Sequence, residues 1–165
     1  MAFDDEGIPT RRLDIIKKGI FQQPFNDLDY AQKSGQEPTG TGLRHEMWGD
    51  DDVTIPPNPY LNHLRIEPGS MTYQQMMDEM DEGIIVMNGI GVHSGNILNG
   101  DISMGLNPGL YVKNGEILGR ARDAMVAGNM YQMFSNVIGV ENKNHREHGI
   151  PLPCVLLDDV SVSGK

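Results

Sequence analysis

The chain has 165 residues, enough for one ordinary domain with a hydrophobic core and too few for two full domains. Its formal net charge of −10 argues against a nucleic-acid partner, because proteins that bind phosphate backbones carry clustered Lys and Arg. No apolar run approaches the roughly 20 residues of a membrane-spanning helix, and the first residues are acidic, unlike a signal peptide. We therefore expect a soluble cytoplasmic protein without a membrane partner. With 11 methionines and only 6% aromatic residues, methionine should fill much of the core.

The first third of the chain predicts a hairpin followed by a helix and a long loop. Residues 10–16 and 20–23 flank Lys17-Lys18-Gly19, a turn sequence that favours a β-hairpin. Residues 36–58 contain several glycines and prolines and the acidic run at 50–52, which is typical of a surface loop.

Between the hairpin and the loop, the sequence predicts a short helix. Asp27 is placed to cap its N-terminus, and Gly35 follows Ser34 where a left-handed stop is needed. Leu28 and Ala31 would form its inward face.

The middle of the chain predicts a strand and a second helix. Residues 61–66 alternate apolar and polar side chains, as a half-buried strand does. Thr72 and Gln75 have the spacing of a capping box at the start of a helix over 72–82 that Gly83 would end. The apolar face of this helix would consist of Tyr73, Met76, Met77, Met80 and Ile84.

Residues 83–119 predict a β-meander, because short apolar runs there are each closed by glycine-bearing turns. Its expected strands contain residues 84–87, 97–98, 102–104 and 110–112, and Asn99-Gly100-Asp101 and Asn114-Gly115-Glu116 are its expected tight turns.

The C-terminal part predicts a helix over 124–137 that ends at Gly139, then a polar loop, then a last strand over 155–162. Cys154 lies in the apolar run 152–157 and is expected to be a buried, unreactive thiol. Together these elements predict one α+β domain over 1–165: a largely antiparallel sheet, or a partly closed barrel of hairpins, with two to three covering helices.

No complete catalytic set is evident from residue types and spacing. His145 and His148 could share a metal only on a rigid helical face, and the predicted polar loop offers none. His93, Ser94 and Asp101 are the residue types of a hydrolase triad, but Ser94 lacks the Gly-x-Ser-x-Gly context and fits a turn at least as well. No phosphate-binding glycine motif is present either.

Six motifs nevertheless occur in the order found in one family. They are Phe3-Asp4-Asp5-Glu6-Gly7, Thr39-Gly40-Thr41-Gly42-Leu43-Arg44, Glu67-Pro68-Gly69, Asn96 with Asn99-Gly100-Asp101-Ile102-Ser103-x-Gly105, Asn114-Gly115-Glu116, and Ala124-x-x-Ala127-Gly128-Asn129. In these motifs nearly the whole chain resembles the C-terminal half of the TldD/PmbA (TldE) proteins, also called modulators of DNA gyrase. The start at Met1 suggests a separately cloned C-terminal domain or a shortened natural relative.

The resemblance implies a bacterial or archaeal cytosolic peptidase system in which two related subunits pair and one carries zinc. The family's His-Glu-x-x-x-His metal motif belongs to the N-terminal half, which this chain lacks. The family's further Cys ligand would fall near residues 144–148, which contain no cysteine, and its role does not transfer to Cys154. The chain is therefore closer to the metal-free PmbA/TldE type, and we expect no metal and no cofactor. Val92 replaces a family glycine, and the proline of the Asn96 motif is lost.

The resulting hypothesis is a non-catalytic domain that contributes a peptide-binding cleft wall and subunit contacts to a metallopeptidase assembly. Strand addition would hold an extended peptide or unfolded protein, with His93, Asn96, Asp101 and Asn129 facing the cleft. These four residues could instead only fix turns and a helix start. The expected partners are a paired TldD/PmbA-type subunit, a missing N-terminal half, or a second copy of the chain. The alternatives are a stand-alone protein-interaction module with no proteolytic role and, more remotely, a zinc hydrolase using His145 and His148.

Overall fold

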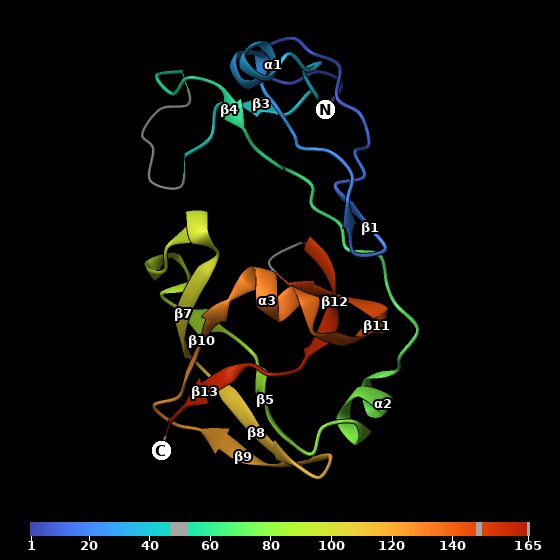
Figure 1. Cartoon of the computed structure of the whole chain (residues 1–165), viewed down its shortest axis with the longest axis vertical. Helices are drawn as coiled ribbons and strands as arrows, with labels where there is room; N and C mark the ends of the chain where they lie inside the picture. The colour runs from blue at the N-terminus through green and yellow to red at the C-terminus, as the bar shows by residue number, and fades with distance from the viewer. Residues whose placement is uncertain (47–52, 148–149, 165) are drawn as a thin grey trace. The chain divides into compact units, whose positions relative to one another are not determined.

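The computed structural model describes residues 1–46, 53–147 and 150–164. They form two compact units, Met1–Leu64 and Arg65–Lys165, each with its own helices and strands (Figure 1). The acidic run at 50–52 and His148 lie outside the described residues.

The predicted N-terminal hairpin is present but short. β1 (Ile16–Lys17) pairs antiparallel with β2 (Ile20–Phe21). Lys18 and Gly19 between them have positive φ angles of 51° and 76°, as a tight hairpin turn of the I′ type requires. Residues 10–15 lie outside the paired strands, so the prediction placed the start of the first strand too early.

The helix α1 (Leu28–Ser34) begins and ends where the sequence predicts. The Asp27 carboxylate caps its N-terminus, and Gly35, with φ 66°, ends it. Ala31 is buried, but Leu28 is 44% exposed, contrary to the prediction. A helix of seven residues makes barely two turns, so it buries only a narrow face.

The remainder of the first unit is held by a buried carboxylate and a two-stranded sheet of β3 (Gly42–Leu43) and β4 (Asn58–Pro59). Asp4 is 7% exposed. It accepts three backbone N–H groups, from Glu6 at 3.1 Å, Ile8 at 2.8 Å and Gly42 at 3.0 Å. Two of the family-like motifs therefore meet at this residue, and the predicted loop at 36–58 is anchored at both ends.

Residues 61–66 form no strand, contrary to the prediction. The boundary between the two units falls within them, at Leu64 and Arg65. A segment with alternating polarity becomes a strand only where another strand bonds to it, and the described residues provide no such strand beside residues 61–66.

The helix α2 (Tyr73–Asp78) is shorter than predicted. Its capping box is confirmed, because Thr72 and Gln75 satisfy each other's backbone N–H groups. It ends before Gly83, which lies in β5 (Glu82–Val86) and is not a helix stop. Cross-strand bonding of β5 therefore overrides the helical pattern at residues 82–84. Two residues of the predicted apolar face are buried on the helix, Met76 and Met77.

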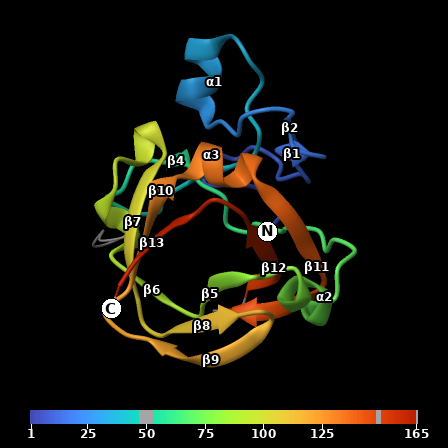
Figure 2. The ribbon, with the colours of Figure 1, turned by 60° about the horizontal axis from the view of Figure 1, so that its bottom comes forward.

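The predicted meander is divided between two sheets. β5, β8 (Gly109–Lys113) and β9 (Glu116–Ala121) lie side by side in one of them (Figure 2). The tight turn between β8 and β9 is confirmed, since Asn114 and Gly115 have φ angles of 49° and 76°.

The second sheet has the order β13-β10-β7-β6, formed by β6 (Gly89–Ile90), β7 (Asp101–Leu106), β10 (Met125–Asn129) and β13 (Ser161–Ser163). Two 3₁₀ turns, η1 (Val92–Ser94) and η2 (Ile97–Asn99), connect β6 to β7. A strand at 97–98 is thus a wrong prediction. Its apolar residues occupy a turn because β7 bonds to β10 and β6 instead.

The helix predicted over 124–137 is restricted to α3 (Met130–Ser135). The residues before it form β10, which bonds to β7 on one side and β13 on the other. Met133 is buried as the apolar face predicts, whereas Phe134 is 51% exposed. Gly139 does not end the helix but lies within the next strand, β11 (Val137–Glu147).

The polar loop predicted after this helix is mostly a strand. β11 pairs antiparallel with β12 (Ile150–Leu157), and His145 lies within it. Cys154 lies in β12 as predicted, but it is half-buried rather than fully buried. The predicted last strand is split, because Asp158 and Asp159 separate β12 from β13.

The α+β class with largely antiparallel pairing is confirmed, and none of the described sheets closes into a barrel. The core of the second unit is aliphatic and methionine-rich, with Val112, Val126, Met133 and Leu156 among its buried residues. The three described helices have six or seven residues each, far short of a membrane-spanning length.

Candidate functional site

The most polar constellation of the second unit lies where β7 and β10 meet α3. Asp101 starts β7 and pairs directly with Asn129, the last residue of β10. Asn129 is also the N-cap of α3. One residue thus joins the end of a strand to the start of a helix.

The Asn129 side chain uses both ends of its amide. Its Nδ2 donates to the Asn99 carbonyl at 2.7 Å and to Asp101 Oδ1 at 2.9 Å, while its Oδ1 accepts the Tyr131 N–H at 3.1 Å. An amide suits this position because it both donates and accepts, whereas a carboxylate could only accept.

Gly100 lets the turn approach the helix. It has a φ of 80°, and a Cβ there would lie 2.6 Å from the Tyr131 ring. Its carbonyl accepts the Met130 N–H at 2.7 Å. The Asn99-Gly100-Asp101 sequence therefore forms a turn that receives the start of α3, not the tight hairpin turn that we predicted.

Three of the four predicted cleft residues are brought together by hydrogen bonds. The Asn96 carbonyl accepts the Asp101 N–H at 3.1 Å, which connects Asn96 to the pair of Asp101 and Asn129. His93 is exposed and lies in the turn η1, two residues before Gly95, whose backbone lies against Asp101. The hydrogen bonds of Asn96, Asp101 and Asn129 hold a turn and a helix start.

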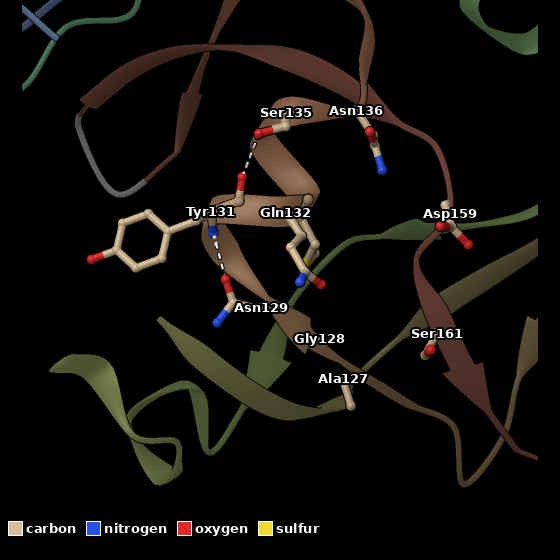
Figure 3. A pocket seen from close by; sticks show the side chains of 10 residues that line it. Ala127, Gly128, Asn129, Tyr131, Gln132, Ser135, Asn136, Asp159 and Ser161 are labelled. Atoms are coloured by element: carbon tan, nitrogen blue, oxygen red, sulfur yellow. Dashed lines mark hydrogen bonds between the residues drawn. The ribbon is translucent and has the colours of Figure 1, made fainter. Parts of the chain in front are cut away.

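Beside this network lies an open pocket with a volume of about 570 Å³ (Figure 3). It lies between α3, the end of β10 and the chain entering β13. Its lining consists of Ala127, Gly128, Asn129, Tyr131, Gln132, Met133, Ser135, Asn136, Asp159 and Ser161.

The pocket is equipped for hydrogen bonding. Gln132 and Asn136 are exposed amides on one side, and Asp159 and Ser161 lie across from them, while the Tyr131 ring points away (Figure 3). Its titratable lining groups are Asp159 and Tyr131, and neither imidazole nor thiol lines it. Such a lining can bind main-chain amides but offers no nucleophile paired with a base.

The sequence-based prediction included Asn129 but missed Gln132, Asn136, Asp159 and Ser161. A signal for the amides was available: residues 129, 132 and 136 follow helical spacing in the sequence, and in the structure Gln132 lies in α3 between its N-cap Asn129 and its C-cap Asn136. The apolar residues of this segment predict a helix face, and its amides predict a second one. Asp159 and Ser161 approach α3 through long-range contacts that no local pattern reveals: β13 pairs with β10, and the Asp158 N–H donates to the Asn136 carbonyl at 2.9 Å.

Comparison with known proteins gives matches over almost the whole chain. Metalloprotease PmbA of Escherichia coli O157:H7 is 32% identical over 165 residues, which cover 99% of this chain and 32% of that protein. TldE from Thermococcus kodakarensis has a solved structure that matches with a TM-score of 0.84 at 28% identity, covering 99% of this chain and 36% of the other. A Thermotoga maritima structure, described as a candidate modulator of a DNA gyrase, matches with a TM-score of 0.80 at 29% identity, covering 99% of this chain and 35% of the other.

The chain spans about a third of the length of these relatives. The family model described as the PmbA/TldA metallopeptidase C-terminal domain matches residues 1–164. The chain therefore belongs to the C-terminal domain family of the PmbA/TldD metallopeptidase-related proteins.

Proposed function

We propose that this chain is the non-catalytic C-terminal domain of a TldD/PmbA-type metallopeptidase system and that it holds an extended peptide in the pocket beside α3. The observation that carries the proposal is the pocket itself. It is an open hollow of about 570 Å³, and exposed amides line it next to the end of a sheet.

Strand addition is the mode of binding that this arrangement favours. β13 is the outermost strand of the order β13-β10-β7-β6, and its residues 161–163 are exposed. An extended peptide can continue a sheet at such an edge through main-chain hydrogen bonds. Gln132 and Asn136 would bind main-chain groups, and Asp159 would select a basic side chain.

The proposed role is non-catalytic because the pocket lacks the groups that hydrolysis needs. A peptidase requires an activated nucleophile or a metal-bound water. The lining supplies one carboxylate and neither His nor Cys, so it does not fit the metal that the family description implies. The chemistry would come from another part of the assembly.

The exposed apolar side chains of α3 and β11 support a role in assembly. Tyr131 is 68% exposed, Phe134 51% and Ile138 47%. Large apolar groups gathered on a surface are characteristic of an interaction site. We infer that they are covered by the N-terminal part of a full-length relative, because this chain spans about a third of such proteins.

An NMR titration of the isotope-labelled chain tests the peptide proposal. The probe is a short blocked peptide of alternating Thr and Val with one central Lys. Shift changes are expected at the amides of β13 and at the side-chain amides of Gln132 and Asn136. Asp159→Asn should remove the preference for Lys over Gln at the central position.

A matched control is Asp123→Asn. Asp123, like Asp159, has a positive φ, 48° against 54°, but it does not line the pocket. Asn tolerates that conformation. The proposal would be contradicted if both variants lost the preference for Lys equally, or if the chemical-shift changes spread outside the pocket. Capture of a folded partner without peptide binding would favour the stand-alone interaction module.

A further inference from the structure

A β-bulge of three residues interrupts the hairpin of β11 and β12. Val140 pairs with Val155 and Asn144 with Pro153, so residues 141–143 of β11 stand opposite the single residue Cys154. A bulge bends a strand and changes the direction of its side chains. This one lies outside the pocket described above.

The bulge brings three metal-ligating side chains together. Glu141 Oε2 lies 2.7 Å from His145 Nε2, and the Cys154 N–H donates to the same oxygen at 3.4 Å. The carboxylate oxygen, imidazole nitrogen and thiol sulfur all lie within 4.8 Å of one another. In a regular strand, residues four apart are separated by roughly 13 Å, so only the bulge makes this cluster possible.

The backbone around Glu141 is held from a second direction. The Glu141 carbonyl accepts the Gly69 N–H at 2.8 Å, and the Met71 carbonyl accepts the Asn142 N–H at 2.7 Å. Tyr73 of α2 lies close by, since burial, Cys154 and Glu141 all raise the pKa of its phenol. The cluster therefore rests on two strands and the segment leading into a helix.

The electrostatics favour a cation at this place. Glu141 is only 3% exposed. Burial alone would raise the pKa of its carboxyl, but hydrogen bonds from Cys154 and His145 more than offset that effect and lower it. In the same bulge, Asn144 Oδ1 is buried without a hydrogen-bond partner among the described residues.

We propose that Glu141, His145 and Cys154 bind one Zn²⁺ ion. Zn²⁺ accepts thiolate, imidazole and carboxylate ligands together, at about 2.3 Å for sulfur and about 2.0–2.2 Å for nitrogen and oxygen. Bonds of these lengths place tetrahedral ligand atoms roughly 3.3–3.7 Å apart, so the Glu141–His145 contact would open by under about 1 Å.

Binding exchanges protons for metal. The Cys154 thiol releases its proton to solvent and binds as the thiolate, and His145 binds as the neutral imidazole. The fourth position is left to water, because the His145 side chain is 42% exposed and provides the route of entry. The ion would link β11 to β12 across the bulge.

The order of the three groups argues against a thiol nucleophile. In such sites a histidine stands between the cysteine and the carboxylate and takes the thiol proton. Here the carboxylate stands between the other two, where its negative charge opposes thiolate formation. A divalent cation removes that repulsion.

Zinc alone is the probe for the test, added to the full untagged chain and followed by calorimetry and by elemental analysis after dialysis. One equivalent is expected to remain. Glu141→Gln and Cys154→Ser should each lower the affinity for zinc by about 100-fold or more. Loss of a residue that only hydrogen-bonds to a metal ligand lowers the affinity by about 10–100-fold. The matched control His63→Gln removes an exposed histidine from the other unit and should leave binding unchanged.

A second measurement needs no variant. The chain has a single cysteine, so the rate of its alkylation reports on Cys154 alone. Zinc should slow that rate more than tenfold, and Co²⁺ in its place should give a thiolate charge-transfer band. Absence of bound zinc, an unchanged alkylation rate, or zinc retained by Cys154→Ser but lost in His148→Gln would overturn the proposal.

Discussion

Replacement of Asn129 by alanine tests whether the network around α3 stabilises the fold. The substitution removes a helix cap, which is worth about 1 kcal/mol. It also removes two donated hydrogen bonds, each worth about 1 kcal/mol at most because both are solvent-exposed. The expected loss is about 2 kcal/mol, or a fall of roughly 10 °C in the melting temperature of a unit of this size.

Thermal unfolding followed by circular dichroism measures the loss, and amide exchange locates it. The Tyr131 N–H should lose protection first, because its acceptor is Asn129 Oδ1. Asn136→Ala is the matched control, since this exposed amide makes no side-chain hydrogen bond that the described residues show. If the two variants melted within about 2 °C of each other, the stabilising role of the network would be refuted.

Three further predictions concern other parts of the chain. Gly100→Ala should destabilise by about 1–2 kcal/mol because of its positive φ, whereas Gly119→Ala, with open space at its Cβ, should not; denaturant melts compare them. Asp4→Ala should lower the free energy of unfolding of the first unit by about 3 kcal/mol or more, since three N–H groups lose a charged acceptor. Faster amide exchange in the first unit would detect this loss. The Tyr111 hydroxyl donates to Glu82 at 2.7 Å, and this hydrogen bond together with burial raises the pKa of the phenol. The stabilisation from the bond is therefore complete below the ordinary tyrosine pKa of about 10 and is lost as the pH rises through the pKa of the folded chain. Glu82→Gln should lower the pKa of Tyr111 in an ultraviolet titration.

Local chemistry made several elements predictable. The Asp27 cap, the Gly35 stop, the Thr72 capping box and the Asn114-Gly115 turn depend on residues within four positions of one another, and all four are present. Their geometry is set by side chains meeting nearby backbone groups. No distant segment can easily change it.

Long-range pairing explains the failures. Residues 125–129 have a helical apolar pattern, but β7 and β13 bond to them from both sides and make them a strand. Gly83 predicts a helix stop, yet its pairing with Val112 of β8 places it in β5. Backbone groups that find partners across a sheet override a weak local preference.

The candidate sites divide in the same way. The resemblance to the family points to Asp101 and Asn129, which lie in two of its motifs, although only the structure shows that they bond to each other. No sequence pattern points to Glu141, and the polar residues around His145 predict a loop. A bulge in β11 brings these two together with Cys154, and neither helical nor strand periodicity predicts such a position.

The most direct test of the proposed function is the affinity of two backbone-methylated versions of the Thr/Val peptide. One carries N-methyl groups at odd positions and the other at even positions. In strand addition only alternate N–H groups of the peptide face the sheet, so we predict that one version loses binding more than tenfold while the other binds like the parent. Equal affinities for both versions, or no binding of the parent peptide, would contradict peptide capture at the edge of β13.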